Sequence, residues 1–428
     1  MTSRTARRAV PAGTAAEPTA YRKTVTGSGI RVITEMVPTV RSVTIGVWAN
    51  VGSRDELPAE NGISHFLEHM VFKGTRNRSV GEIARSLESL GGYLNAFTTK
   101  EHTCFYARVL DAHVPQAVDV LADLLQNPTF RPGELEKEKA VVIEELKNAE
   151  DDPEDCIHDY VEKAVFPDHA LGLPVIGNER NLRAFRREDL RSHLDEHYAG
   201  PTLIVAAAGN VDHDALVRLV ARSFRPRARA RGAQARPPAP GGRRSGTRVE
   251  HGRAITQAHV CLGRTGYSVH HRDRYPLAVL NTLLGEGMSS RLYQSVREKH
   301  GLAYAVYSFV QFISDTGLFG AYAGTDRTNV ERSIELIHEE LDRLRRRPVP
   351  ASELARTKAQ IKGTTMLGLE NMSGRMMRLG TGELYFGRQV PIATVLRNVD
   401  AVTAEGVQRV ARDLFRPEEF STVVIRPA

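Results

Sequence analysis

Two histidines and a glutamate lie within five residues of each other in the stretch NGISHFLEHMVFKGT (61–75), at His65, Glu68 and His69. On a helix, residues four apart project from one face, so both imidazoles could bind one metal ion, with Glu68 beside them. Catalytic zinc takes neutral imidazole nitrogens and keeps one coordination position open for water. Glu68 could then accept a proton from that water. The pattern predicts a hydrolytic metal centre.

A surface helix with two solvated histidines would show the same five-residue pattern, so the neighbouring residues matter. Phe66 and Leu67 lie between the first histidine and Glu68, and both are apolar. Apolar residues at this spacing indicate a helix that packs against a core. This context favours the metal site over two solvated histidines.

A third metal ligand is expected, because catalytic zinc usually has three protein ligands and a carboxylate often completes two histidines. The helical segment 136–153 offers several glutamates, most of which we expect on a solvated acidic face. Glu138 and Glu145 are seven positions apart and therefore lie nearly on one face. The pattern alone does not choose between Glu144 and Glu145 as the ligand.

The expected elements alternate between strands and helices. In the first half, apolar periodicity predicts strands at 29–36, 42–50, 103–109 and 202–209, helices at 61–73, 80–90, 113–126 and 132–150, and an acidic helix from about Pro153. In the second half it predicts strands at 258–263, 317–324 and 421–427, and helices at 275–284, 289–299, 328–345 and 350–369.

The two halves resemble each other. GELEKEKA (133–140) matches SELARTKA (352–359) at an offset of 219 residues, and a second short match follows the same order at an offset of 209. At the first offset, Glu138 and Glu145 correspond to Thr357 and Thr364, and the second half has no H-x-x-E-H. We therefore expect a duplication, with one catalytic domain and one degenerate partner domain.

The predicted fold class is α+β, with two homologous α/β domains that each consist of a mixed β-sheet flanked by helices. The predicted organisation is a disordered tail at 1–20, a catalytic zinc-binding domain at 21–224, an Arg/Pro-rich linker at 225–249 and a homologous non-catalytic domain at 250–428.

The formal net charge of +7 is concentrated in one segment. Eight arginines and no acidic residue lie between Arg225 and Arg248, among several prolines and glycines, which is typical of a solvated linker. The segment lacks interleaved aromatic residues and a nucleic-acid recognition motif, so we expect no nucleic-acid partner.

The cysteines and the hydropathy of the chain argue against a disulfide-rich, a secretory or a membrane-spanning protein. The three cysteines, Cys104, Cys156 and Cys261, form no C-x-x-C pair, so neither a disulfide framework nor a cysteine zinc site is predicted. We find no secretory apolar run and no stretch of about 18 apolar residues. We therefore expect a cytoplasmic protein with no membrane partner, and leaderless export is the alternative.

The H-x-x-E-H helix is followed, after 75 residues, by the second glutamate of an E-x6-E pair. In this the chain resembles the pitrilysin or insulinase-type metallopeptidases, and most closely the branch that includes mitochondrial processing peptidase and its bacterial homologues. The likeness continues through LNAFTTKEHTCFYARV (94–109) and SSRLYQSVREKHGLAYAVYS (289–308). It implies two domains that form half of a clamshell.

The resemblance also implies residue roles. Glu145 would be the third zinc ligand and Glu138 a supporting carboxylate, with one Zn²⁺ per chain. Arg297 and Tyr304 match the family's R-x6-Y pair, whose guanidinium and phenol suit a substrate carbonyl. Asn95 lies where the family presents an edge strand to the peptide.

The expected function is that of a zinc metalloendopeptidase that hydrolyses peptides or unfolded protein segments, with Glu68 as the general base. The family implies a homodimer, or a heterodimer with a related subunit. The alternative is a non-catalytic peptide-binding or scaffold subunit of a processing-peptidase-like complex. The intact set of His65, Glu68, His69 and Glu145 favours the enzyme.

Overall fold

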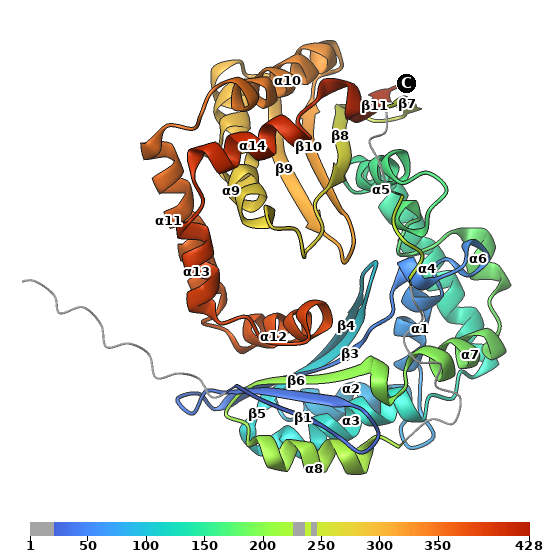
Figure 1. Cartoon of the computed structure of the whole chain (residues 1–428). Helices are drawn as coiled ribbons and strands as arrows, with labels where there is room; N and C mark the ends of the chain where they lie inside the picture. Colours follow the sequence, from blue (N-terminus) through green and yellow to red (C-terminus); the bar gives the residue numbers. More distant parts are fainter. Residues whose placement is uncertain (1–20, 226–235, 241–245) are drawn as a thin grey trace, which may run out of the picture.

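The computed structural model describes residues 21–225, 236–240 and 246–428. The expected disordered tail and most of the expected linker lie outside these residues. The chain forms two halves that face each other across an arch (Figure 1).

The first half contains a six-stranded mixed sheet in the order β1-β2-β6-β3-β5-β4, in which only the β2–β6 pair is parallel. Its strands are β1 (Tyr21–Val25), β2 (Arg31–Met36), β3 (Ser42–Ala49), β4 (Tyr93–Thr98), β5 (Thr103–Leu110) and β6 (Leu203–Gly209). Its helices are α1 (Ile63–Val71), α2 (Val80–Glu88), α3 (Val114–Gln126), α4 (Pro132–Asp151), α5 (Pro153–Val165), α6 (Glu179–Ala184), α7 (Arg187–His197) and α8 (His213–Ser223).

The second half contains a five-stranded mixed sheet in the order β7-β11-β8-β10-β9, in which only the β7–β11 pair is parallel. Its strands are β7 (Arg248–Arg253), β8 (Ala258–Gly266), β9 (Ala303–Phe312), β10 (Gly317–Thr325) and β11 (Ser421–Pro427). Its helices are α9 (Arg274–Gly285), a π-helical segment (Tyr293–Lys299), α10 (Val330–Arg346), α11 (Ala351–Gly368), α12 (Met372–Phe386), α13 (Ile392–Asp400) and α14 (Ala404–Leu414).

The two sheets repeat one topology. The strand order β2-β6-β3-β5-β4 of the first sheet matches β7-β11-β8-β10-β9 of the second, with the parallel pair at the same place, and β1 is added at one edge. This match confirms the predicted α+β fold of two similar domains, and the arch is consistent with half of a clamshell (Figure 1).

Each half places one helix on the sheet of the other half (Figure 1). Helix α5 buries Ile157 and Val161 in a cluster with residues of β8, β10 and β11. Helix α12 packs on β3 and β6, where a Cβ at Gly380 would lie 2.1 Å from an atom of the Trp48 ring. Only glycine fits at this contact, and the exchanged helices hold the two halves together.

Several helices and strands, among them α12, were not predicted from the sequence pattern. Three glycines at 374, 380 and 382 lower the helix propensity of this segment, yet packing against the first sheet stabilises the helix. The strand β7 begins at Arg248, inside the range expected to be linker.

The described part of the expected linker differs from a solvated one. Arg236 donates to the Asp55 carboxylate at 2.8 and 3.1 Å, and its side chain is only 17% exposed. The sequence predicts solvated arginines here because no acidic residue is nearby in the sequence, whereas the partner of Arg236 comes from a loop of the first half.

Among the described helices, none combines the length and the apolar character that crossing a lipid bilayer requires.

Candidate metal centre and substrate edge

Helix α1 carries the H-x-x-E-H residues, and its apolar face fixes its orientation. Ile63, Phe66, Leu67, Met70 and Val71 are all buried in the core of the first half. The remaining positions turn His65, Glu68 and His69 away from this core.

The start of α1 is held by a buried carboxylate. Glu56 accepts hydrogen bonds from the backbone N–H groups of Gly62 and Ser64, both at 2.8 Å, and from the Asn61 side chain at 3.2 Å. Burial raises the pKa of Glu56 to about 7, and the hydrogen bonds from Ser64 and Gly62 oppose this rise. Gly62 itself has a φ of +99°, a conformation that favours glycine.

The structure brings His65, His69 and Glu145 together. Glu145 Oε1 lies 3.7 Å from His65 Nε2, and Glu145 Oε2 lies 3.4 Å from His69 Nε2. One donor atom of each residue lies within 4.8 Å of the others. Ligands about 2.0–2.1 Å from a tetrahedral zinc ion are roughly 3.4 Å apart, so this donor set fits zinc.

Helix α4 selects Glu145 over its neighbour. Glu144 points away and pairs with Lys147 at 2.6 Å. The buried stripe of α4 includes Ile143, whereas Val141 is 50% exposed. Glu144 and Glu145 point in different directions because neighbouring helical residues are rotated by about 100° around the axis.

Glu138 supports the site from the same helix. Its Oε1 lies 2.9 Å from His69 Nδ1 and its Oε2 lies 2.7 Å from Lys73 Nζ. Burial tends to raise the pKa of Glu138, but the hydrogen bonds from His69 and Lys73 lower it overall. An ionised Glu138 accepts from Nδ1–H, which leaves the lone pair of His69 Nε2 for a metal.

The two histidines differ in electrostatics. Burial, together with the neighbouring His69, lowers the pKa of His65 to about 4, so His65 is neutral at pH 7. Burial also tends to lower the pKa of His69, but the Glu138 hydrogen bond and the Glu145 charge raise it overall. The pKa shifts of the two imidazoles therefore have opposite directions.

Glu68 lies next to the metal-binding group and is held by a residue that the sequence analysis did not single out. Thr98, the last residue of β4, donates its hydroxyl to Glu68 Oε2 at 2.6 Å. Burial raises the pKa of Glu68, and this hydrogen bond opposes the rise. No sequence signal separates Thr98 from Thr99, because the contact depends on how β4 lies beside α1.

Strand β4 forms the edge of the first sheet. Asn95 lies on this edge and is exposed, with its side chain bonded to the Tyr93 hydroxyl and to the backbone N–H of Ala96. An edge strand presents main-chain groups that an extended peptide can pair with. The strand that carries Asn95 therefore ends at the residue that holds Glu68.

Arg297 and Tyr304 lie together in the second half, where Tyr304 is on the edge strand β9. Arg297 donates to the Tyr304 carbonyl at 2.8 Å, and its guanidinium lies 4.8 Å from the ring centroids of Tyr293 and Tyr304. Tyr304 is 75% exposed. The structure thus joins the two residues of the R-x6-Y pattern into one exposed donor group.

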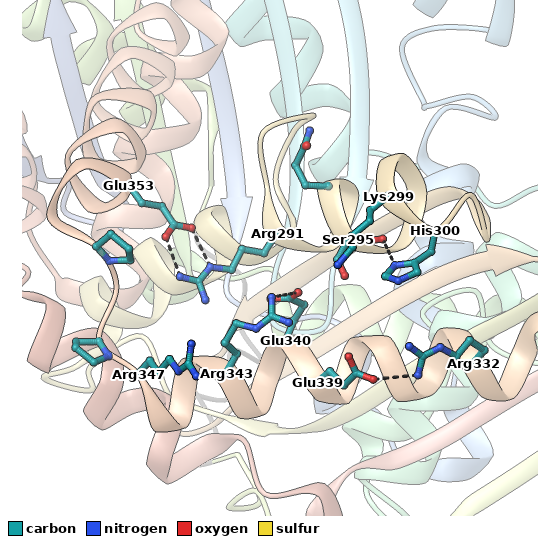
Figure 2. A pocket seen from close by; sticks show the side chains of 13 residues that line it. Arg291, Ser295, Lys299, His300, Arg332, Glu339, Glu340, Arg343, Arg347 and Glu353 are labelled. Carbon is teal, nitrogen blue, oxygen red and sulfur yellow. Dashed lines mark hydrogen bonds and ion pairs between the residues drawn. The ribbon is translucent and has the colours of Figure 1, made fainter.

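A cavity of about 760 Å³ lies elsewhere in the second half, between the π-helical segment, α10 and α11 (Figure 2). Several of its charged side chains pair with each other: Arg291 donates to Glu353 twice at 2.8 Å, and Arg332 donates to Glu339 at 3.0 Å. Among the described residues that line it, none belongs to the metal-binding group. This cavity is therefore separate from the metal-binding group.

Comparisons with known proteins show the family of the chain. The family model for insulinase, peptidase family M16, matches residues 31–179, and that for the peptidase M16 inactive domain matches residues 184–361. An uncharacterized zinc protease of Streptomyces coelicolor is 44% identical over 398 residues, which is 92% of this chain and 87% of the relative. The beta subunit of mitochondrial-processing peptidase of Blastocladiella emersonii is 34% identical over 411 residues, 94% of this chain and 87% of that protein.

A solved structure of a protease from Helicobacter pylori shares the fold, with a TM-score of 0.89 and 22% identity over 96% of this chain and 100% of that one. The family and the names of the relatives support a zinc-dependent protease, and they confirm the resemblance seen in the sequence. The chain belongs to the insulinase family of peptidases, family M16.

Proposed function

We propose that this chain is a zinc metalloendopeptidase in which His65, His69 and Glu145 bind one Zn²⁺ and Glu68 is the general base. The observation that carries the proposal is the approach of Glu145 to both imidazoles, at 3.4 and 3.7 Å. Glu68 lies beside these three residues without being one of them, so it is left for proton transfer. When bound, zinc would polarise a peptide carbonyl and lower the pKa of a water molecule.

Glu68 accepts the proton of the attacking water and then delivers it to the leaving amine. The Thr98 hydroxyl fixes one carboxylate oxygen of Glu68, which leaves the other free to face the reacting water. Glu138 and Lys73 keep the His69 ring in the orientation that presents Nε2 to the metal.

The substrate is an extended peptide or an unfolded protein segment. Strand β4, including Asn95, offers main-chain groups at the edge of the first sheet, and main-chain pairing tolerates many side chains. Arg297 and Tyr304 would hold a substrate carbonyl, either within the chain or across the interface of a homodimer or a heterodimer.

The test is hydrolysis of a quenched fluorescent peptide library, with zinc measured on each protein. Glu68→Gln should reduce hydrolysis by about 100- to 10,000-fold and still bind about one zinc per chain. Glu145→Gln should lose zinc. The matched control is Glu144→Gln, which alters the neighbouring residue on the face turned away from the histidines and should keep both zinc and activity.

A wild-type protein that binds no zinc would refute the site. If the wild type binds zinc but cleaves no peptide, the non-catalytic peptide-binding subunit becomes the better explanation. Addition of a related subunit would then separate a missing partner from a binding role.

A further inference from the structure

Three consecutive charged residues, Arg54, Asp55 and Glu56, contact three different parts of the molecule. They follow β3 and precede α1 in the chain. The side chain of Arg54 is fully buried, and Glu56 is 5% exposed. Buried charges are costly unless they are paired, so these contacts fix the segment in place.

Arg54 connects the segment to the second half. It donates from Nη1 and Nη2 to the two carboxylate oxygens of Asp315, both at 2.7 Å. Asp315 lies in the turn between β9 and β10, and it also accepts from the backbone N–H of Ala239 at 2.8 Å. The same turn donates from Ser314 to Glu101 of the first half, through both its backbone N–H and its hydroxyl.

Asp55 connects the segment to the chain between the two sheets. Both of its carboxylate oxygens accept from Arg236, at 2.8 and 3.1 Å. Arg236 also donates to the Glu101 carbonyl at 2.5 Å. The connecting segment is therefore bonded to the residue that precedes Glu56.

Glu56 connects the segment to the metal-binding helix. Both of its oxygens accept from backbone N–H groups in the first turn of α1, at Gly62 and Ser64. Ser64 is the residue before the ligand His65. A shift of Glu56 therefore moves the end of α1 that carries His65.

We propose that residues 54–56 are a positioning relay, through which the turn between β9 and β10 and the segment at Arg236 set the position of α1. The relay rests on the proposed function for its effect on catalysis. None of Arg54, Asp55 and Glu56 belongs to the metal-binding group. Because β9 also carries Tyr304, the strand that offers the substrate donors is connected by hydrogen bonds to the helix that binds the metal.

The test compares Asp315→Asn, Glu56→Gln and the double variant. Asp315→Asn removes one charge in the second half, and Glu56→Gln places an amide NH₂ against backbone N–H donors. Each should raise the zinc dissociation constant and lower kcat by about 2- to 30-fold, with KM little changed. If Asp315 acts through Glu56, the double variant should equal Glu56→Gln alone.

The matched control is Glu35→Gln, which breaks another buried ion pair between the halves, with Arg375 of α12, far from the start of α1 in the chain. It should leave the zinc dissociation constant and kcat unchanged. If Asp315→Asn does not fold, Arg236→Gln takes its place, because it removes the hydrogen bonds that Asp55 of the relay accepts.

Amide hydrogen exchange of the zinc-free proteins separates the relay from the proposed function. In Asp315→Asn, the Gly62 and Ser64 amides should exchange about 2- to 30-fold faster, while those of α3 keep the wild-type rate. Faster exchange at these two amides would support the relay; if in addition the zinc-loaded wild type cleaves no peptide even with a related subunit added, the relay stands and the proposed function is overturned. Unchanged exchange, additive effects in the double variant, or an equal loss in Glu35→Gln would overturn the relay.

Discussion

Thr98→Val should strongly slow hydrolysis although Thr98 is not part of the metal-binding group. The valine keeps the size and branching of threonine but cannot donate to Glu68. The Thr98 Oγ1–Glu68 Oε2 distance of 2.6 Å is that of a charge-assisted O–H···O⁻ hydrogen bond, and the contact is partly buried. Its loss leaves the Glu68 carboxylate free to rotate.

The magnitude follows from the type of bond. A hydrogen bond to a charged group contributes about 1.5–3 kcal/mol, which corresponds to roughly 10- to 150-fold in rate at about 1.4 kcal/mol per decade. Because the bond orients the base rather than the peptide, we expect the loss in kcat, with KM nearly unchanged.

The assay is steady-state hydrolysis of one fluorogenic peptide by wild type, Thr98→Val and Thr98→Ser, each at measured zinc occupancy. Thr98→Ser retains the hydroxyl and should recover most of the lost rate. If Thr98→Val keeps the wild-type kcat, or if serine fails to restore it while zinc stays bound, the positioning argument for Thr98 is refuted.

Three further predictions concern stability and the metal. Leu67→Ala should lower the free energy of unfolding by about 2–5 kcal/mol in chemical denaturation, because Leu67 is fully buried in the core beneath α1; a loss below 1 kcal/mol would contradict this packing. Burial, with His197 adding to it, lowers the pKa of His193 to about 3, so the unfolded chain binds a proton below pH 6.5 that the native chain does not. The His193 contribution to stability should therefore fall by about 2 kcal/mol from pH 7 to pH 5, measured as the difference in pH dependence between the wild type and His193→Gln; a His193→Gln protein with the same pH dependence would argue against this origin. A chelator should abolish hydrolysis and lower the melting temperature, and zinc at about 100 times its dissociation constant should restore about 2.7 kcal/mol of stability; a melting temperature insensitive to zinc would contradict the site.

The central part of the site could be predicted from the sequence because it is local. His65, Glu68 and His69 lie on one helix, and a spacing of three or four residues fixes their common face whatever surrounds them. The duplication was also visible in the sequence, and the matching strand orders of the two sheets agree with it.

The choice between Glu144 and Glu145 required more than the helix pattern. The two side chains point about 100° apart, and the packing of α4 against α1 decides which one faces the histidines. The family resemblance indicated Glu145, but periodicity on its own left both open.

The contacts that hold the site join residues far apart in the chain, and only the tertiary structure decides them. Thr98 meets Glu68 because β4 ends beside α1, and Arg236, from the described residues 236–240, meets Asp55 of the first half. Short-range pattern cannot encode such pairs, since their partners are set by how strands and helices pack. The sequence by itself therefore determined the two histidines and Glu68 of the candidate metal centre, whereas the supports of Glu68 and of α1 depend on the folded chain.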